Sequence, residues 1–131
     1  MIDLLSAVQQ AVYDALVAAN IGMPVYTAPP EGMQPPYMVV ADMDNESEAD
    51  KGDGQFEYIT FEVHFWIRGG SRVPLLQAMH AGRVALDNKP LAADGARIEN
   101  ARWLKGSVSR AGPDGVTYVG VNQFETYGQP A

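Results

Sequence analysis

The 131-residue sequence contains no cysteine and only two histidines, His64 and His80. Without cysteine the chain has no disulfide bond, no thiolate nucleophile and no cysteine-ligated metal site. The two histidines are sixteen residues apart, a spacing that matches no local metal-ligand motif. Glycine motifs that bind phosphate groups are also missing. We therefore expect no enzyme activity, no cofactor and no metal site.

Long apolar runs are absent as well. No stretch approaches the roughly 18 consecutive apolar residues that a membrane-spanning helix needs. The N-terminal MIDLLSAVQQ lacks the basic region of a signal peptide. We therefore expect no membrane association and a protein made in the cytoplasm. The length suits one domain, so we expect residues 1–131 to form a single domain.

The net charge of −7 is unevenly distributed along the chain. Residues 42–57 hold seven acidic residues and one lysine, whereas residues 68–110 hold the other eight basic residues and three acidic ones. Such a charge dipole suits head-to-tail contacts between identical subunits, in which unlike patches meet. The alternative is that these charges are ordinary solvated surface groups.

Two segments have the apolar periodicity of amphipathic helices. Apolar residues at three- and four-residue steps predict one helix over residues 3–19 and a second between residues 71 and 88. These stripes would bury one side of each helix. Their main positions are Leu5, Val8, Val12 and Leu16 in the first helix, and Leu75, Met79, Gly82 and Leu86 in the second.

Residues 56–68, FEYITFEVHFWIR, alternate strictly and predict a long strand. Its odd-numbered residues are apolar and predict a buried face covered by the two helices. Its even-numbered residues mix aromatic rings with polar and charged groups, a composition typical of protein interfaces. Further strands are predicted over residues 23–27, 37–43, 97–108 and 116–127, the last two joined as a hairpin through the sequence PDG.

The resulting order of elements is α-β-β-β-α-β-β. This order predicts an α+β fold, in which a mainly antiparallel sheet carries both helices on one face. The other face of the sheet is then left for neighbouring molecules.

The candidate contacts between subunits lie on the even-numbered face of the long strand and on the basic arm that follows the second helix. Aromatic residues in such positions commonly act as anchors. The basic arm, with its tryptophan, also has a pattern that can follow a phosphate backbone. The acidic balance of the chain argues against affinity-determining DNA binding. The candidate interface residues are Tyr58, Glu62, His64, Trp66, Arg68, Arg97, Arg102, Trp103 and Lys105.

The segment DNESEADKGDG, residues 44–54, is acidic and has no apolar residue larger than alanine. We predict that it forms a mobile surface loop between two antiparallel strands. The candidate residues for lining a lumen or for docking are Asp44, Glu46, Glu48, Asp50 and Asp53.

An alternative is an ion- or ligand-binding domain that uses the acidic residues 42–53. Counted from Asp42, the segment partly matches the calcium-binding EF-hand loop. The match fails where Ser47 replaces the turn glycine and where Asp53 replaces the bidentate glutamate. Strands are also predicted on both sides in place of helices, so the match favours a solvated loop.

The order of motifs resembles the tail completion, or tail terminator, proteins of long-tailed bacteriophages, prophages and gene-transfer particles. Each motif is short, and together they follow one another over most of the chain. The matching pieces are PYMVV at residues 36–40, HFW at 64–66 with Arg68 and Gly69, DGVT at 114–117 and GV at 120–121. The sequence departs from the family pattern at Ile67, where a small polar residue is expected.

The resemblance implies a small α+β subunit that forms a homo-oligomeric ring, typically with six copies. Such a ring ends the tail tube and joins it to the head-tail connector, and DNA passes through its lumen without specific binding. The implied location is the virion tail, after assembly in the bacterial host. The resemblance brings no catalytic residue to this sequence. It implies as partners the tail tube protein and the connector protein.

Overall fold

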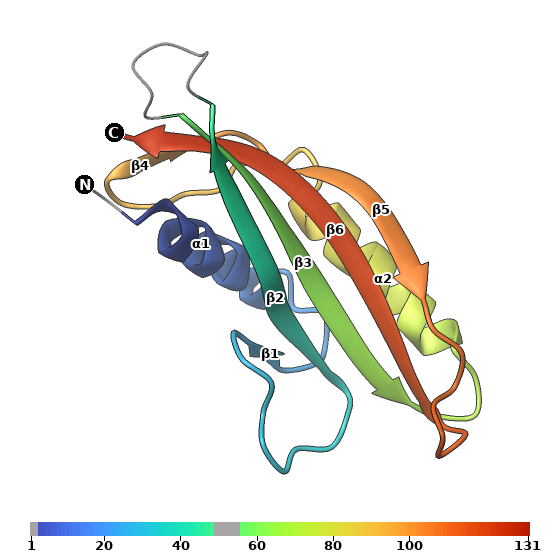
Figure 1. The fold of residues 1–131 in the computed structure, drawn as a ribbon. Coiled ribbons are helices and arrows are strands. Elements are labelled where there is room, and N and C mark those ends of the chain that lie inside the picture. The colour runs from blue at the N-terminus through green and yellow to red at the C-terminus, as the bar shows by residue number, and fades with distance from the viewer. Residues whose placement is uncertain (1–2, 49–55) are drawn as a thin grey trace.

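The structure is a computed structural model that describes residues 3–48 and 56–131. It has two layers, a twisted sheet and two helices that pack behind it (Figure 1). The predicted α+β fold is confirmed. In chain order the elements are α1 (Leu4–Ala18), β1 (Val25–Tyr26), β2 (Tyr37–Ser47), β3 (Glu57–Arg68), α2 (Val73–Leu86), β4 (Ala96–Ile98), β5 (Arg102–Val108) and β6 (Thr117–Pro130).

The sheet is mainly antiparallel and is built around β3 and β6. Its strand order is β1-β2-β3-β6-β4, and β5 also pairs with β6. β1 is a short strand parallel to β2, whereas the other pairings are antiparallel. The predicted hairpin is confirmed, because β5 and β6 pair on either side of the PDG turn.

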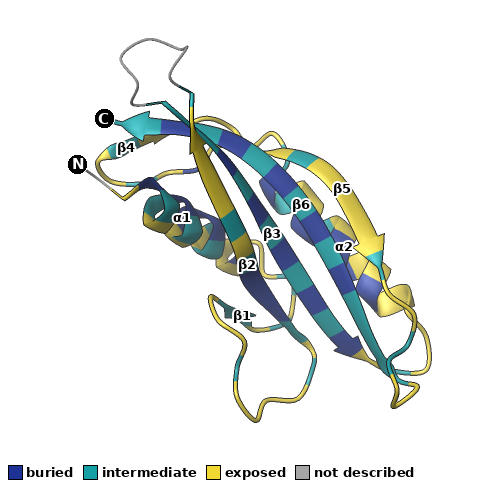
Figure 2. Ribbon diagram, in the orientation of Figure 1, coloured by how far each residue is buried: buried dark blue, intermediate teal, exposed yellow. Residues whose placement is uncertain are grey.

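The alternation of the predicted long strand is borne out in β3. Its odd-numbered residues from Ile59 to Ile67 are buried, and its even-numbered residues up to Trp66 are half-buried. Figure 2 shows this alternation as successive bands along β3 and β6. The buried face is the one against the helices, so the sheet has one face covered by its own chain.

Both helices bury most of the predicted apolar stripes, although Leu5 is only half-buried and Leu4 is buried in its place. In α1 the buried side includes Val8, Val12 and Leu16. Asp3 caps this helix, since its carboxylate accepts hydrogen bonds from the Ser6 backbone N–H at 3.1 Å and the Ser6 hydroxyl at 2.6 Å. The side-chain bond from Ser6, and then the backbone bond, lower the pKa of Asp3. No helix of the described ranges is long and apolar enough to cross a membrane.

Glycine lets α2 approach the sheet closely. A Cβ atom at Gly82 would lie 2.7 Å from the buried ring of Phe65, and one at Gly120 in β6 would overlap the Met79 sulfur. Nearby, the rings of Phe61 and Phe124 stack with centroids 5.2 Å apart. The packing of the core therefore needs glycine at two contacts between α2 and the sheet, in addition to the apolar side chains that fill it.

Two predicted boundaries need correction. β2 continues to Ser47, so Asp44 and Glu46 belong to a strand and not to the predicted loop 44–54. They pair with Thr60 and Tyr58 of β3, and this pairing outweighs the low strand propensity of acidic residues. Glu48 follows the strand, and its backbone N–H donates to the carbonyl of Phe56. Asp50 and Asp53 lie outside the described residues.

The second correction concerns the segment 97–108, which was predicted as one strand. It consists of β4 and β5, which pair with different parts of β6. Between them Glu99 donates its backbone N–H to Tyr127, and Ala101 is buried. The strand pairing with β6 is therefore interrupted between Ile98 and Arg102, although Glu99 still bonds to β6.

Candidate assembly face of the sheet

The face of the sheet opposite the helices carries most of the predicted interface residues, and we call it the outer face. Residues that lie opposite one another on antiparallel strands share a face. The register therefore places the even-numbered residues of β3 beside the odd-numbered residues of β6 and the basic residues of β4 and β5. The predicted residues on this face are Tyr58, Glu62, His64, Trp66, Arg68, Arg97, Arg102 and Lys105.

An aromatic group covers one end of the outer face. Trp66 pairs with Tyr37 of β2 and Val119 of β6. The rings of Tyr37 and Trp66 stack with centroids 6.1 Å apart, and Tyr26 meets Tyr37 edge-on at 6.0 Å. Trp66 is thus half-buried by its own chain and keeps part of its ring available to a neighbour.

A second aromatic group lies at the other end of the outer face. The rings of Tyr58 and Tyr127 have centroids 5.3 Å apart. The Tyr58 hydroxyl donates a 2.8 Å hydrogen bond to Glu125 Oε1. This bond, followed by burial, raises the pKa of Tyr58 to about 12. The tyrosine is therefore a neutral donor over the physiological pH range.

Between the two aromatic groups, one histidine meets two carboxylates. His64 Nε2 lies 2.8 Å from Glu62 Oε1 and 3.7 Å from Asp42 Oδ2. Glu62 and His64 are two residues apart on β3, whereas Asp42 comes from β2. The sequence predicted Glu62 and His64 as interface residues and did not connect them with Asp42.

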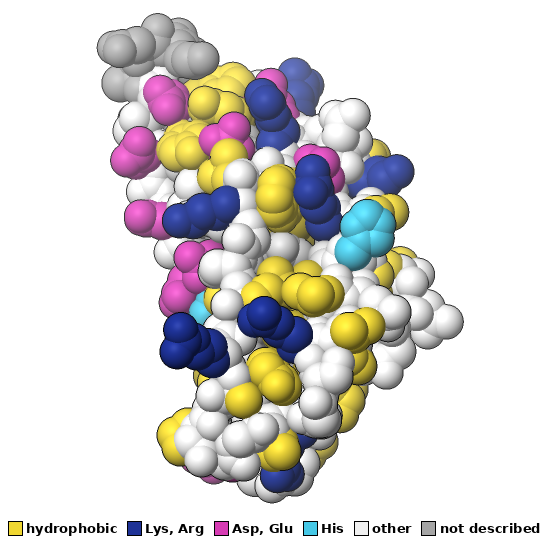
Figure 3. Space-filling model, turned by 90° about the vertical axis from the view of Figure 1, so that its right-hand side faces the viewer, with side chains coloured by type: hydrophobic (Ala, Val, Ile, Leu, Met, Phe, Trp, Pro, Cys, Tyr) yellow, Lys and Arg dark blue, Asp and Glu magenta, His cyan; other side chains and the backbone are white. Residues whose placement is uncertain are grey.

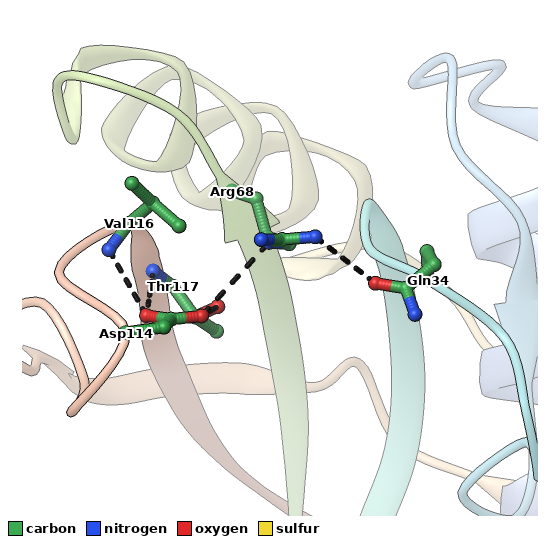
Figure 4. A network of polar contacts seen from close by, with 5 residues as sticks. All are labelled: Gln34, Arg68, Asp114, Val116 and Thr117. Atoms are coloured by element: carbon green, nitrogen blue, oxygen red, sulfur yellow. Dashed lines mark hydrogen bonds and ion pairs between the residues drawn. The ribbon is translucent and has the colours of Figure 1, made fainter.

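Arg68, the last residue of β3, lies between Gln34 and Asp114, which belong to two different loops (Figure 4). Its Nη1 donates to Gln34 Oε1 at 3.1 Å, and its Nε lies 3.9 Å from Asp114 Oδ2. Asp114 accepts hydrogen bonds from the Thr117 hydroxyl and from the backbone N–H groups of Val116 and Thr117. These bonds, the hydroxyl of Thr117 first, lower the pKa of Asp114 to about 2. Arg68 therefore has a role within its own chain.

Trp103 was predicted as an interface residue, but it lies on the face of the sheet that the helices cover and not on the outer face. A register shift between Trp103 and Lys105 adds one residue to β5, so Arg102 and Lys105 share the outer face. Trp103 points to the helix side, where its Nε1 donates to Asn122 at 3.1 Å. The guanidinium of Arg83 in α2 lies 3.7 Å from its ring centroid. The structure therefore separates Trp103 from the other predicted interface residues.

Opposite charges gather at opposite sides of the sheet. β2 carries Asp42, Asp44 and Glu46, whereas β5 carries Arg102 and Lys105, and β3 and β6 lie between them. Figure 3, viewed from the side of β5, shows basic side chains across this surface, with several acidic ones along one edge and others among the basic ones. Two residues of the calcium-loop spacing considered from the sequence, Asp44 and Glu46, lie in a paired strand, and Asp53 lies outside the described residues.

Comparison with known proteins identifies the family. The family model described as tail completion protein gp17 matches residues 6–128. The chain belongs to the tail completion family.

A solved structure titled as the virion of a native gene transfer agent particle contains a chain similar to this tail completion protein. It has a TM-score of 0.78 and 19% sequence identity, over 97% of this chain and 98% of that one. At this identity the likeness shows a shared fold. No curated protein sequence matches the chain significantly. Family membership makes the chain a structural component of a phage-type tail.

Proposed function

We propose that this tail completion protein forms a closed ring of identical copies, with six as the expected number. The ring would end the tail tube and join it to the head-tail connector. The observation that carries the proposal is the family match over residues 6–128. The similar chain in a gene transfer agent virion supports a place in a tail-like particle. The role is structural and needs no catalytic residue.

The distribution of charge supports contacts of the head-to-tail kind. A ring closes when one surface of each subunit meets a different surface of the next. The acidic side at β2 and the basic side at β5 are two such surfaces, and their opposite charges favour one relative orientation. We propose that the interface includes Glu62, Arg97, Arg102 and Lys105, with Trp66 and Tyr58 as aromatic anchors.

The acidic segment after β2 suits a surface that faces DNA without binding it. Carboxylates repel the phosphate backbone, and this repulsion would keep the DNA free to slide through the ring. Glu48, which follows β2, would contribute to this surface, whereas Asp44 and Glu46 lie within β2 and belong to the acidic side that meets the next subunit. Asp50 and Asp53, predicted from the sequence for the same role, lie outside the described residues.

Electron microscopy of tail tubes tests this function. Tubes assembled without this protein are mixed with the purified chain and imaged beside tubes that receive none. The proposal predicts a ring at one end of each treated tube, and joining to heads that carry a connector. Tubes whose ends stay bare at saturating protein, and that join heads no better than untreated tubes, would refute it.

A further inference from the structure

The cluster of Asp42, Glu62 and His64 has the chemistry and the spacing of a metal site. One ligand atom from each side chain can be chosen so that all three lie within 4.8 Å of one another. We propose that these residues bind a divalent first-row transition ion such as Zn²⁺, Co²⁺ or Ni²⁺. Because Glu62 also belongs to the proposed interface, ion binding is tested on the unassembled chain, where it does not depend on ring formation.

The distances suit one ion held between the three side chains. In a tetrahedral site with bonds of about 2.1 Å, ligand atoms lie about 3.4 Å apart. His64 Nε2 is 2.8 Å from the Glu62 oxygen, which is shorter than this separation, and 3.7 Å from the Asp42 oxygen, which is slightly longer. All three ligand atoms lie within 4.8 Å of one another, and rotation of the largely exposed Asp42 side chain would bring its oxygen closer to the other two.

The backbone explains why Asp42 reaches this place. Along β2, Ala41 pairs with Glu62 and Asp44 pairs with Thr60, so β2 has one residue more than β3 between these pairs. In an unbroken register Asp42 would face Phe61, which is fully buried. The bulge instead lets Met43 pack against the core, and Asp42 adopts a positive φ of 39°. Its carboxylate thereby lies beside His64.

The donor set decides the class of metal. One imidazole nitrogen with two carboxylates suits Zn²⁺ and its neighbours, whereas Ca²⁺ and Mg²⁺ prefer oxygen ligands throughout. Three protein ligands leave at least one position for water or another group. The Asp42 side chain is 74% exposed, so that position is open to solvent. The site is thus suited to an exchangeable ion.

Isothermal titration calorimetry of the untagged protein with ZnCl₂ tests the proposal. We expect one ion bound per chain. His64→Gln and the conservative Glu62→Gln should each lower the affinity at least tenfold, because even indirect ligand supports are worth about 10–100-fold. His80→Gln removes the other histidine, from α2, and should change nothing. Circular dichroism confirms that each variant is folded.

A second readout follows the ligands directly. Co²⁺ in place of Zn²⁺ should give visible absorption bands that His64→Gln abolishes and His80→Gln retains. The proposal is wrong if the wild-type protein takes up no ion. It is also wrong if folded His64→Gln binds as tightly as the wild type, or if His80→Gln weakens binding as much as His64→Gln does.

Discussion

At the scale of single residues, Trp66 has two sets of contacts to satisfy. One part of its ring stacks on Tyr37. The rest of the ring lies on the outer face of the sheet, away from the helices. We predict that Trp66→Ala destabilises the fold by about 1–2 kcal/mol, less than loss of a fully buried tryptophan. It should weaken assembly by about 30-fold, the effect of an interface anchor worth about 2 kcal/mol. Urea unfolding and native mass spectrometry measure the two effects.

Trp103→Ala is the matched control. This tryptophan is also half-buried, but it packs against α2 on the covered face. Its loss should lower stability and leave the assembly of the folded protein unchanged. If Trp66→Ala weakens assembly no more than Trp103→Ala does, the outer face is not the contact surface.

Asp114 makes the free energy of unfolding depend on pH in the acidic range. Its pKa of about 2 lies below the ordinary value of about 4, so its bonds stabilise the folded protein fully above pH 4. This contribution is lost as the pH falls from about 4 to about 2. We predict that Asp114→Asn flattens the fall in unfolding free energy over that interval, as measured by urea unfolding at each pH.

The causes of this pKa can be ranked by NMR titration of the carboxyl group. Thr117→Val removes the largest contribution and should raise the pKa of Asp114 more than Arg68→Gln does. A larger rise in Arg68→Gln would show that the ion pair, at 3.9 Å, outweighs the hydroxyl.

At the scale of elements, the contact of α2 with the sheet depends on Gly82. Alanine favours helices over glycine by about 1 kcal/mol. At this position, however, the added methyl group would lie 2.7 Å from the Phe65 ring. Overpacking typically costs about 1–3 kcal/mol, so we predict that Gly82→Ala is destabilising by about 1 kcal/mol. Thermal and urea unfolding measure this change.

Gly70→Ala provides the comparison, since a Cβ atom there would meet nothing within 4 Å. Its effect should be near zero. Equal stabilities of the two alanine variants would contradict the close approach of α2 to Phe65.

The sequence predicted the elements whose apolar residues repeat with a clear period. β3 and both helices follow from this periodicity, because their buried sides are nearly uniform in composition. The end of β2 was missed, since its acidic residues have low strand propensity and only pairing with β3 holds them extended. The break between β4 and β5 depends likewise on contacts with β6.

The candidate site was predictable only in part. Even-numbered residues of β3 had to share a face, so Tyr58, His64 and Trp66 were grouped correctly. The bulge in β5 turns Trp103 away, and the bulge in β2 brings Asp42 to His64. Both depend on one extra residue in a pairing register, which no spacing along the chain reveals. The pattern Glu-x-His on one strand was the available signal for the cluster.

At the scale of the whole molecule, the sheet separates the two charges that the sequence places far apart. The acidic residues of β2 and the basic residues of β5 lie at opposite sides of β3 and β6. We propose that these two sides meet in successive copies of a ring.

Native mass spectrometry of charge-reversed variants, alone and with tail tubes, tests this claim most directly. Arg102→Glu with Lys105→Glu should abolish rings, as should Asp44→Lys with Glu46→Lys, because each variant then presents like charges to its neighbour. Lys89→Glu, outside both strands, is the control and should still assemble. Mixing the two reversed variants should restore rings in which they alternate, because every contact then joins unlike charges. Combining all four changes in one chain should also restore rings. Rings that persist in either double variant would show that the two sides do not meet. So would the absence of rings in the fourfold variant, provided that this variant is folded.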